Sequence, residues 1–358
     1  MTGPASSASG PPPLAHAEPA MGTVFSFAVV TGVQPETALR AAIGGACEIL
    51  HRCDALFSTW DGASPASRYR RGEVTLSQMP PEFHQVVEEC HAAKRASDGW
   101  FDPWAMPGGF DPTGLVKGWA TERALDVLRA LGVPGALING GGDVAAFGAP
   151  ASGQRWRVGI RHPWRPDALA GIVETAAAVA TSGCYERGRH LIDPRTGQPA
   201  SCAASATVTG PSLALADALA TGIAVGGDEA LPAVSRLTGY AAYLIRADGS
   251  ETSTGGIELV RLSLLPPSRA LGPGGLAGFG RLVLGAGTPQ RRLGRLMRRS
   301  ARRLRRVGKA WDRHAGASLG SGRGRYGGMT AHRIWLRGTR TTKRRTRRRL
   351  SNAGADHR

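Results

Sequence analysis

The sequence predicts an α+β protein, and three observations lead to this fold class. Apolar residues recur at helical spacing over residues 35–57, 81–96 and 116–131. Short runs rich in valine, isoleucine or phenylalanine, residues 24–30 and 136–138, are typical of strands. A glycine run follows the second of these strands. It lacks the G-x-G-x-x-G pattern and a directly following helix, so a Rossmann fold is not indicated.

The first residues of the chain, 1–19, are rich in Pro, Ser, Gly and Ala and are predicted to be a disordered leader. They lack a basic segment followed by an apolar core, so they do not resemble a secretory signal, and they lack a lipobox cysteine. Nothing in the chain is long and apolar enough to span a bilayer. We therefore expect a cytoplasmic protein, with membrane association left open.

The first two helices have recognisable ends. Pro35 suits the first turn of the helix over residues 35–57. The helix over residues 81–96 ends before Asp98-Gly99, which is a turn dipeptide. Three later strands are predicted. Residues 155–160 and 172–180 are expected to belong to an antiparallel sheet, and residues 240–246 to form the last strand of the domain.

Residues 110–120 are predicted to be a loop that runs into a helix. Pro112 and Gly114 interrupt the chain there, and Asp111 and Lys117 lie within one turn of the helix start. Because a helix N-terminus presents unpaired N–H groups, anions bind there readily. The pattern fits an anion site, and it equally fits a capped surface helix with a solvated lysine.

Asp217 and Thr221 lie four residues apart on a helix predicted over about residues 213–225. This spacing places both oxygen-bearing side chains on one helix face. Oxygen ligands suit a hard cation such as Mg²⁺, which takes waters and phosphate oxygens for its other positions. A buried Asp–Thr hydrogen bond in an alanine-rich helix is the alternative.

The charge is concentrated at the C-terminal end. Residues 281–358 hold 24 of the 45 Lys and Arg but two of the 27 acidic residues, a net charge of +22, whereas the remainder is near −4. The composition of residues 263–358 is rich first in Gly and Pro and then in Arg, and this segment is predicted to be a disordered tail. Such a tail would contact nucleic acid or an anionic membrane surface, or would have no function.

Five cysteines, none in a C-x-x-C pair, are spaced unlike the ligands of a zinc site. We therefore expect reduced thiols, most of them packed in the core. They are Cys47, Cys53, Cys90, Cys184 and Cys202.

Several short motifs occur in a characteristic order. They are Ala20-Met21-Gly22-Thr23, Phe57-Ser58-Thr59-Trp60, Phe101-Asp102-Pro103, Asp111-Pro112-Thr113-Gly114-Leu115-Val116-Lys117-Gly118, Asn139-Gly140-Gly141-Gly142-Asp143, Thr181-Ser182-Gly183, His190-Leu191-Ile192-Asp193-Pro194-Arg195-Thr196-Gly197 and Asp217-Ala218-Leu219-Ala220-Thr221. Each is weak alone, but in this order they resemble the FAD:protein FMN transferases, the ApbE family. The resemblance runs from about Met21 to about Ile257 and suggests a domain over residues 20–262.

The resemblance implies two subdomains with the FAD and metal site in the cleft between them. It implies that Gly114, Asp217 and Thr221 hold Mg²⁺ and that His190, Lys117 and Asp217 are catalytic. It further implies FAD contacts at Met21, Trp60, Phe101, Asp102, Asp111, Lys117, Ser182, Gly183 and His190.

The implied reaction transfers FMN from FAD to a Ser or Thr hydroxyl of an acceptor flavoprotein and releases AMP. Splitting the pyrophosphate needs charge neutralisation, which a metal ion and Lys117 would supply. It also needs a base for the hydroxyl, for which His190 is the candidate. Three alternatives remain: an FAD pyrophosphatase giving FMN and AMP, a flavin-binding protein without turnover, and a nucleic-acid-binding protein acting through its tail.

Overall fold

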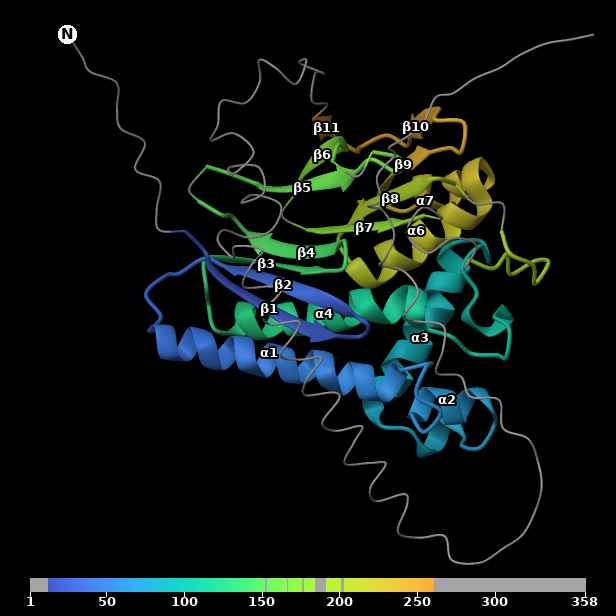
Figure 1. Cartoon of the computed structure of the whole chain (residues 1–358), viewed down its shortest axis with the longest axis horizontal. Helices are drawn as coiled ribbons and strands as arrows, with labels where there is room; N and C mark the ends of the chain where they lie inside the picture. The colour runs from blue at the N-terminus through green and yellow to red at the C-terminus, as the bar shows by residue number, and fades with distance from the viewer. Residues whose placement is uncertain are drawn as a thin grey trace, which may run out of the picture. The chain divides into compact units, whose positions relative to one another are not determined.

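The computed structural model describes residues 12–260, except for 152, 166, 176, 184–190 and 201–202. Figure 1 shows how the helices and strands, numbered in chain order, are arranged in space. They are β1 (Leu14–Ala20), β2 (Thr23–Val29), α1 (Glu36–Phe57), α2 (Pro65–Arg70), η1 (Leu76–Gln78), α3 (Pro81–Ala96), η2 (Pro103–Ala105), α4 (Thr113–Ala130), β3 (Gly135–Gly140), β4 (Asp143–Gly148), β5 (Trp156–Arg161), β6 (Leu169–Thr175), β7 (Ala178–Ser182), β8 (Ser205–Gly210), α6 (Leu213–Gly226), η3 (Gly227–Ala230), α7 (Leu231–Ser235), β9 (Ala241–Ile245), β10 (Glu251–Ser253) and β11 (Leu259–Val260).

The described strands form two sheets. The larger has eight strands in the order β1-β2-β3-β4-β7-β8-β9-β10, and the smaller has three in the order β11-β6-β5. Every pair of neighbouring strands is antiparallel. The α+β class is therefore confirmed. All described residues fall within one compact unit.

The large sheet is covered on both faces, and the pleat of its strands explains how. Successive residues of a strand point to opposite faces. Along β9, Ala242 and Leu244 join the core shared with the helices, whereas Tyr243 and Ile245 join a core shared with β5 and β6. Figure 1 shows the small sheet on one side of the large sheet and α1 and α4 on the other.

Most predicted elements form at the predicted places, with two differences. The helices over residues 35–57 and 81–96 and the strands near residues 24–30, 155–160 and 240–246 are confirmed. The predicted disordered leader is wrong for residues 14–19, because they form β1, the edge strand of the large sheet, paired with β2.

The predicted single strand over residues 172–180 is also wrong. Its first part belongs to β6 in the small sheet and its last part to β7 in the large sheet. The change of sheet follows Thr175, whose side-chain hydroxyl accepts a hydrogen bond from the backbone N–H of Ala177 at 2.9 Å. A local turn of this kind competes with a continuous ladder.

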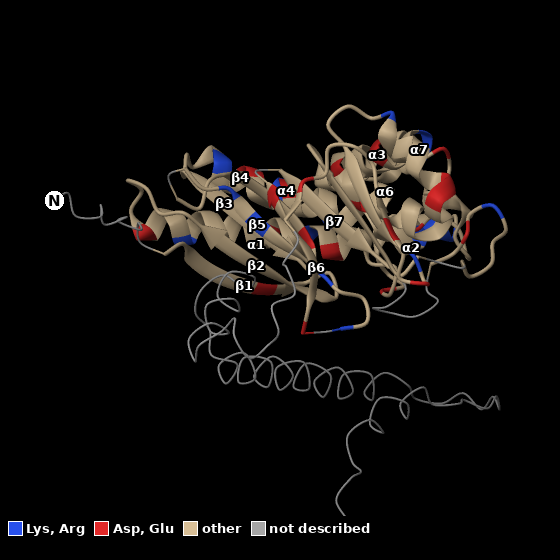
Figure 2. Ribbon diagram, turned by 90° about the horizontal axis from the view of Figure 1, so that it is seen from above, with Lys and Arg blue, Asp and Glu red and all other residues tan. Residues whose placement is uncertain are grey.

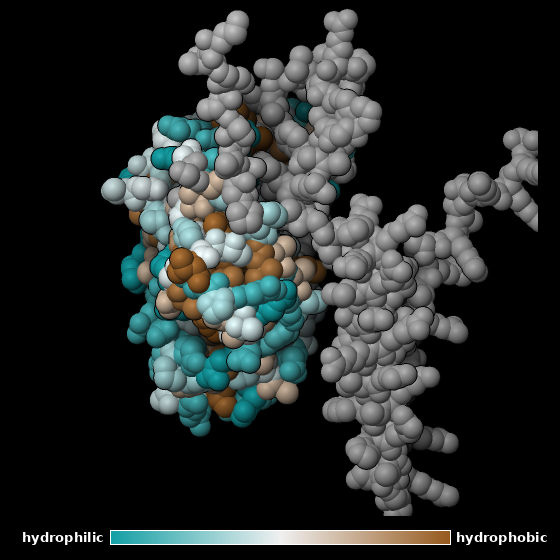
Figure 3. All heavy atoms as spheres, turned by 90° about the vertical axis from the view of Figure 1, so that its left-hand side faces the viewer, coloured by the Kyte–Doolittle hydropathy of each residue, from teal (hydrophilic) through white to brown (hydrophobic). Residues whose placement is uncertain are grey.

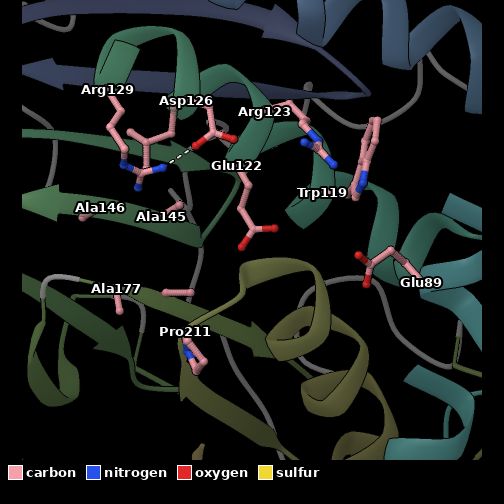
Figure 4. A pocket seen from close by; sticks show the side chains of 12 residues that line it. Glu89, Trp119, Glu122, Arg123, Asp126, Arg129, Ala145, Ala146, Ala177 and Pro211 are labelled. Atoms are coloured by element: carbon pink, nitrogen blue, oxygen red, sulfur yellow. Dashed lines mark hydrogen bonds and ion pairs between the residues drawn. The ribbon is translucent and has the colours of Figure 1, made fainter. Parts of the chain in front are cut away.

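Helices α4 and α6 cross in close contact, and this crossing positions the site described below. Gly118 of α4 lies against the first turn of α6: a Cβ there would be 2.6 Å from the Leu213 carbonyl oxygen. One turn further along α4, the Glu122 carboxylate accepts a hydrogen bond from the Leu213 backbone N–H. Figure 4 shows Glu122 extending from α4 toward the start of α6, where a carboxylate complements the helix dipole.

Burial raises the pKa of Glu122, and hydrogen bonds from Leu213 and Ser212 offset only part of this effect. We therefore expect Glu122→Gln to alter how stability depends on pH. Between the unfolded pKa of about 4.3 and the raised folded pKa, the unfolded chain loses this proton first, so rising pH favours unfolding. Wild type should lose stability relative to Glu122→Gln as pH rises through that window, by up to about 1.4 kcal/mol per pH unit.

Urea denaturation at a series of pH values measures this difference. Glu88→Gln, at an exposed position on α3, is the matched control and should follow wild type at every pH. A pH-independent difference between wild type and Glu122→Gln would contradict the prediction.

The described surface is mixed in character. Figure 2 shows acidic and basic residues interspersed over the helices and sheet edges, in keeping with the near balance of charge before residue 281. Figure 3 shows apolar side chains reaching the surface in the middle of one face, with hydrophilic residues around them. Among the described residues, the exposed large apolar side chains are Val33, Trp60, Trp164 and Val260. No helix of the described part is both long and apolar enough to cross a membrane.

Candidate active site

One pocket gathers ten of the residues that the sequence singled out. It opens between the β1–β2 turn, the loop around η2, the start of α4, the end of β7 and one face of α6. The predicted residues that line it are Met21, Phe101, Asp102, Asp111, Gly114, Lys117, Ser182, Gly183, Asp217 and Thr221. Segments separated by about two hundred residues of chain therefore contribute to one site.

A buried aspartate pairs with a lysine that lines this pocket. The Lys117 ammonium lies 2.5 Å from Asp143 Oδ2, and the Asp143 side chain is 2% exposed. Asp143 Oδ1 accepts a hydrogen bond from the Thr181 backbone N–H at 3.0 Å, which fixes the carboxylate at the end of β7. This ion pair holds the Lys117 ammonium in place beside the pocket that the lysine lines.

Asp217 lies close enough to this pair to respond to both charges. Burial raises the pKa of Asp217 well above its ordinary value, and the neighbouring Asp143 carboxylate raises it further. The Lys117 charge and a hydrogen bond from the Gly118 backbone lower it by less. Two carboxylates that share a buried site repel each other unless a proton or a cation compensates their charge.

The residues present fit a divalent cation. Asp217 Oδ2 is buried without a hydrogen-bond partner among the described residues. Thr221 Oγ1 lies 3.2 Å from Ser182 Oγ, and a Cβ on Gly114 would lie 3.2 Å from the same Thr221 oxygen. An unsatisfied buried carboxylate oxygen costs about 1–3 kcal/mol or more. A hard cation with oxygen ligands would satisfy it.

Met21 reaches the pocket from a strained turn. Ala20 pairs with Thr23, so Met21 and Gly22 are the two-residue turn of the β1–β2 hairpin. Both have positive φ, +49° and +71°, as a type I′ turn requires. This conformation is uncommon for methionine, and the Asp54 carboxylate supports it by accepting a hydrogen bond from the Met21 N–H at 2.9 Å.

The two predicted aspartates before prolines also line the pocket, and each is held by local contacts. Asp102 pairs with Lys94 at 2.6 Å and caps η2 by accepting from the Trp104 N–H at 3.0 Å. Asp111 accepts from the backbone and the hydroxyl of Thr113, at 3.1 and 2.7 Å. These contacts fix both carboxylates at the pocket wall.

The other two predicted site residues are Trp60 and His190. The Trp60 side chain is 94% exposed and does not line the pocket, so stacking of Trp60 on the flavin stays a prediction without structural support. His190 lies outside the described residues. Two neighbours of its motif, Leu191 and Ile192, do line the pocket.

Sequence reasoning missed two carboxylates that organise the site. Asp143 was part of a recognised motif but was not assigned a role, and it holds Lys117. Asp54 lies within a helix next to buried residues and supports the turn at Met21. The one sequence feature that could have pointed to Asp143 is its position directly after the three glycines 140–142. Nothing local distinguished Asp54.

Comparisons with known proteins place the chain in a family. The model of the ApbE family matches residues 21–109 and 106–244. An FAD:protein FMN transferase from Rhodobacter capsulatus is 36% identical over 149 residues, 39% of this chain and 28% of that protein. One from Salmonella typhimurium is 32% identical over 155 residues, 40% of this chain and 44% of that protein. The matched part of the chain thus spans less than half the length of these relatives.

Solved structures show the same fold. The flavin transferase ApbE from Vibrio cholerae superposes with a TM-score of 0.58 at 21% identity, over 68% of this chain and 97% of that one. The apo form of the Pseudomonas stutzeri flavinyl transferase ApbE gives 0.59 at 24% identity, over 77% and 98%. With the family model matched over most of the described residues, the chain belongs to the ApbE family.

Proposed function

We propose that this chain transfers FMN from FAD to a Ser or Thr hydroxyl of an acceptor flavoprotein, with release of AMP, in a Mg²⁺-dependent reaction. The observation that supports this most is that Lys117, which pairs with the buried Asp143, and Asp217 line the same pocket as the predicted flavin contacts. The relatives named FAD:protein FMN transferase support the same activity.

In the proposed reaction, the acceptor hydroxyl oxygen forms a bond to the phosphorus of the FMN half of FAD. The bond from this phosphorus to the bridging oxygen breaks, and AMP leaves with that oxygen. The hydroxyl proton passes to a base, for which His190 is our candidate from its sequence motif. FMN remains on the acceptor as a phosphoester.

The residues of the chain take distinct roles in this proposal. Lys117, oriented by Asp143, holds phosphate oxygens and stabilises the charge that develops on them. Asp217, Thr221 and Gly114 would hold Mg²⁺, which when bound neutralises charge at the pyrophosphate. Met21 and Phe101 offer apolar surface to the flavin nucleotide.

The function is tested by incubating the chain with FAD, Mg²⁺ and candidate acceptor flavoproteins, followed by intact mass measurement of each acceptor. We expect the acceptor mass to rise by that of one FMN less one water, with one AMP released for each FMN transferred. Free FMN and AMP with an unmodified acceptor would instead indicate an FAD pyrophosphatase. FAD binding without either product would indicate a flavin-binding protein without turnover.

His190→Asn tests the proposed base. Asparagine retains a polar side chain of similar reach but does not take up a proton near neutral pH. We expect FAD binding to persist and the transfer rate to fall by about 10²–10⁴-fold. Equilibrium binding of FAD and single-turnover transfer separate the two effects. A variant that no longer binds FAD would make His190 a binding residue.

A further inference from the structure

A second cluster of metal-ligating side chains lies outside the active-site pocket, where β1 meets α1. His16 and Glu18 are two residues apart on β1 and therefore share a face of the strand. Cys47 and His51 are four residues apart on α1 and therefore share a face of the helix. None of the four lines the active-site pocket, and Figure 1 shows β1 running beside α1.

Three ligand atoms of this cluster converge. His16 Nε2 lies 3.3 Å from Glu18 Oε2 and 3.5 Å from Cys47 Sγ. All three atoms lie within 4.8 Å of one another. The other carboxylate oxygen, Glu18 Oε1, lies 2.8 Å from His51 Nε2.

We propose that His16 Nε2, Glu18 Oε2 and Cys47 Sγ bind one Zn²⁺ ion and that His51 donates a hydrogen bond to Glu18 Oε1. Zinc bond lengths of about 2.0–2.1 Å to nitrogen or oxygen and about 2.3 Å to sulfur give tetrahedral N···O and N···S edges of about 3.4 and 3.6 Å. The observed separations of 3.3 and 3.5 Å match these edges. The distances from His16 Nε2 to the other two ligand atoms therefore already suit the ion, and the third separation, between Glu18 Oε2 and Cys47 Sγ, is at most 4.8 Å.

The surroundings of the cluster suit zinc. A mixed nitrogen, sulfur and oxygen set is typical of Zn²⁺ and unlike the all-oxygen sets of Mg²⁺ or Ca²⁺. One carboxylate and one thiolate neutralise the charge of the ion. The His16 ring packs edge-on against Phe27 at 5.6 Å, which limits its rotation. The His16 and His51 side chains are 39% and 52% exposed, so water can reach the fourth position.

A metal ion at this site would connect β1 to α1, and β1 leads directly into the turn that contains Met21. Among the described strands, β1 pairs with β2 alone, and its last residue directly precedes Met21. A metal that joins β1 to α1 would therefore fix the hairpin whose turn presents Met21 to the pocket. The proposal does not depend on the transfer reaction, because metal binding is measured without FAD.

Co²⁺ substitution in the full chain tests the site. With excess Mg²⁺ occupying oxygen-ligand sites, one equivalent of Co²⁺ should produce the charge-transfer absorption of a cobalt–thiolate bond, and Zn²⁺ should remove it. Cys47→Ser should abolish this absorption. Cys53→Ser, a buried cysteine on the same helix, is the matched control and should retain it.

Two further variants keep the test decisive. If Cys47→Ser fails to fold by circular dichroism, His16→Gln replaces it, because its half-exposed ring contributes less to the core. His51→Gln should weaken Zn²⁺ binding by about 10–100-fold while leaving the thiolate absorption in place.

Zinc should also stabilise the folded chain. At about 100-fold excess over the Kd, Zn²⁺ should raise the Tm of wild type by about 5–10 °C. Absent thiolate absorption in wild type, or absorption that persists in Cys47→Ser, would overturn the proposal.

Discussion

Asp217→Asn should abolish Mg²⁺-dependent cleavage of FAD while the domain stays folded. Asparagine keeps the size of the side chain and removes the charge that a cation needs. The Asp217 carboxylate is buried, and one of its oxygens has no hydrogen-bond partner among the described residues. We expect the rate to fall by about 10²–10⁴-fold, since metal stabilisation of a phosphoryl transition state amounts to several kcal/mol.

The same change should leave stability in chelator unchanged or higher. A buried carboxylate beside Asp143 is unfavourable in the absence of a cation, and a neutral amide relieves that repulsion. Thermal melts in chelator and FAD cleavage in Mg²⁺ therefore separate a metal ligand from a folding residue. Asp126→Asn, an exposed carboxylate on α4 paired with Arg129, is the control. Full activity in Asp217→Asn, or wild-type activity that chelator does not reduce, would contradict the assignment.

The parts of the site that could be predicted from sequence lie on short local motifs. Asp217 and Thr221 are one helical turn apart, and Gly114 and Lys117 are three residues apart near the start of α4. Such spacings survive into the structure because each is fixed within one element. What joins the two helices is the crossing at Gly118, and no local pattern reveals a crossing.

The parts that could not be predicted depend on distant pairing. β1 contains Pro19 and alternates poorly, so its strand conformation comes from its pairing with β2 and from cover by α1. The Lys117–Asp143 contact joins helix α4 to strand β4, and it forms because α4 packs against the sheet that contains β4. The cysteine spacing gave no sign of a metal site at Cys47, because the other two proposed ligands come from a strand.

Gly118→Ala should destabilise the domain and impair FAD cleavage together. In most helix interiors, Gly→Ala stabilises by about 0.5–1 kcal/mol. At Gly118, the added Cβ would lie 2.6 Å from the Leu213 carbonyl oxygen and 2.9 Å from the Ala214 nitrogen. Both are backbone atoms, so α4 and α6 must move apart. Overpacking of this kind costs about 1–3 kcal/mol.

The loss of activity follows because the two helices carry different parts of the site. Separation of α4 from α6 moves Gly114 and Lys117 away from Asp217 and Thr221. A displacement of about 1 Å at a catalytic centre costs roughly 10²-fold in rate. Gly44→Ala is the matched control, because it lies in α1 with nothing within 4 Å of an added Cβ, and it should stabilise the domain and keep full activity. Urea denaturation and initial rates of FAD cleavage measure both effects. If Gly118→Ala stabilised the domain as Gly44→Ala does, the prediction would be wrong. The contact of α4 and α6 at Gly118 would then not determine the positions of the metal and phosphate ligands.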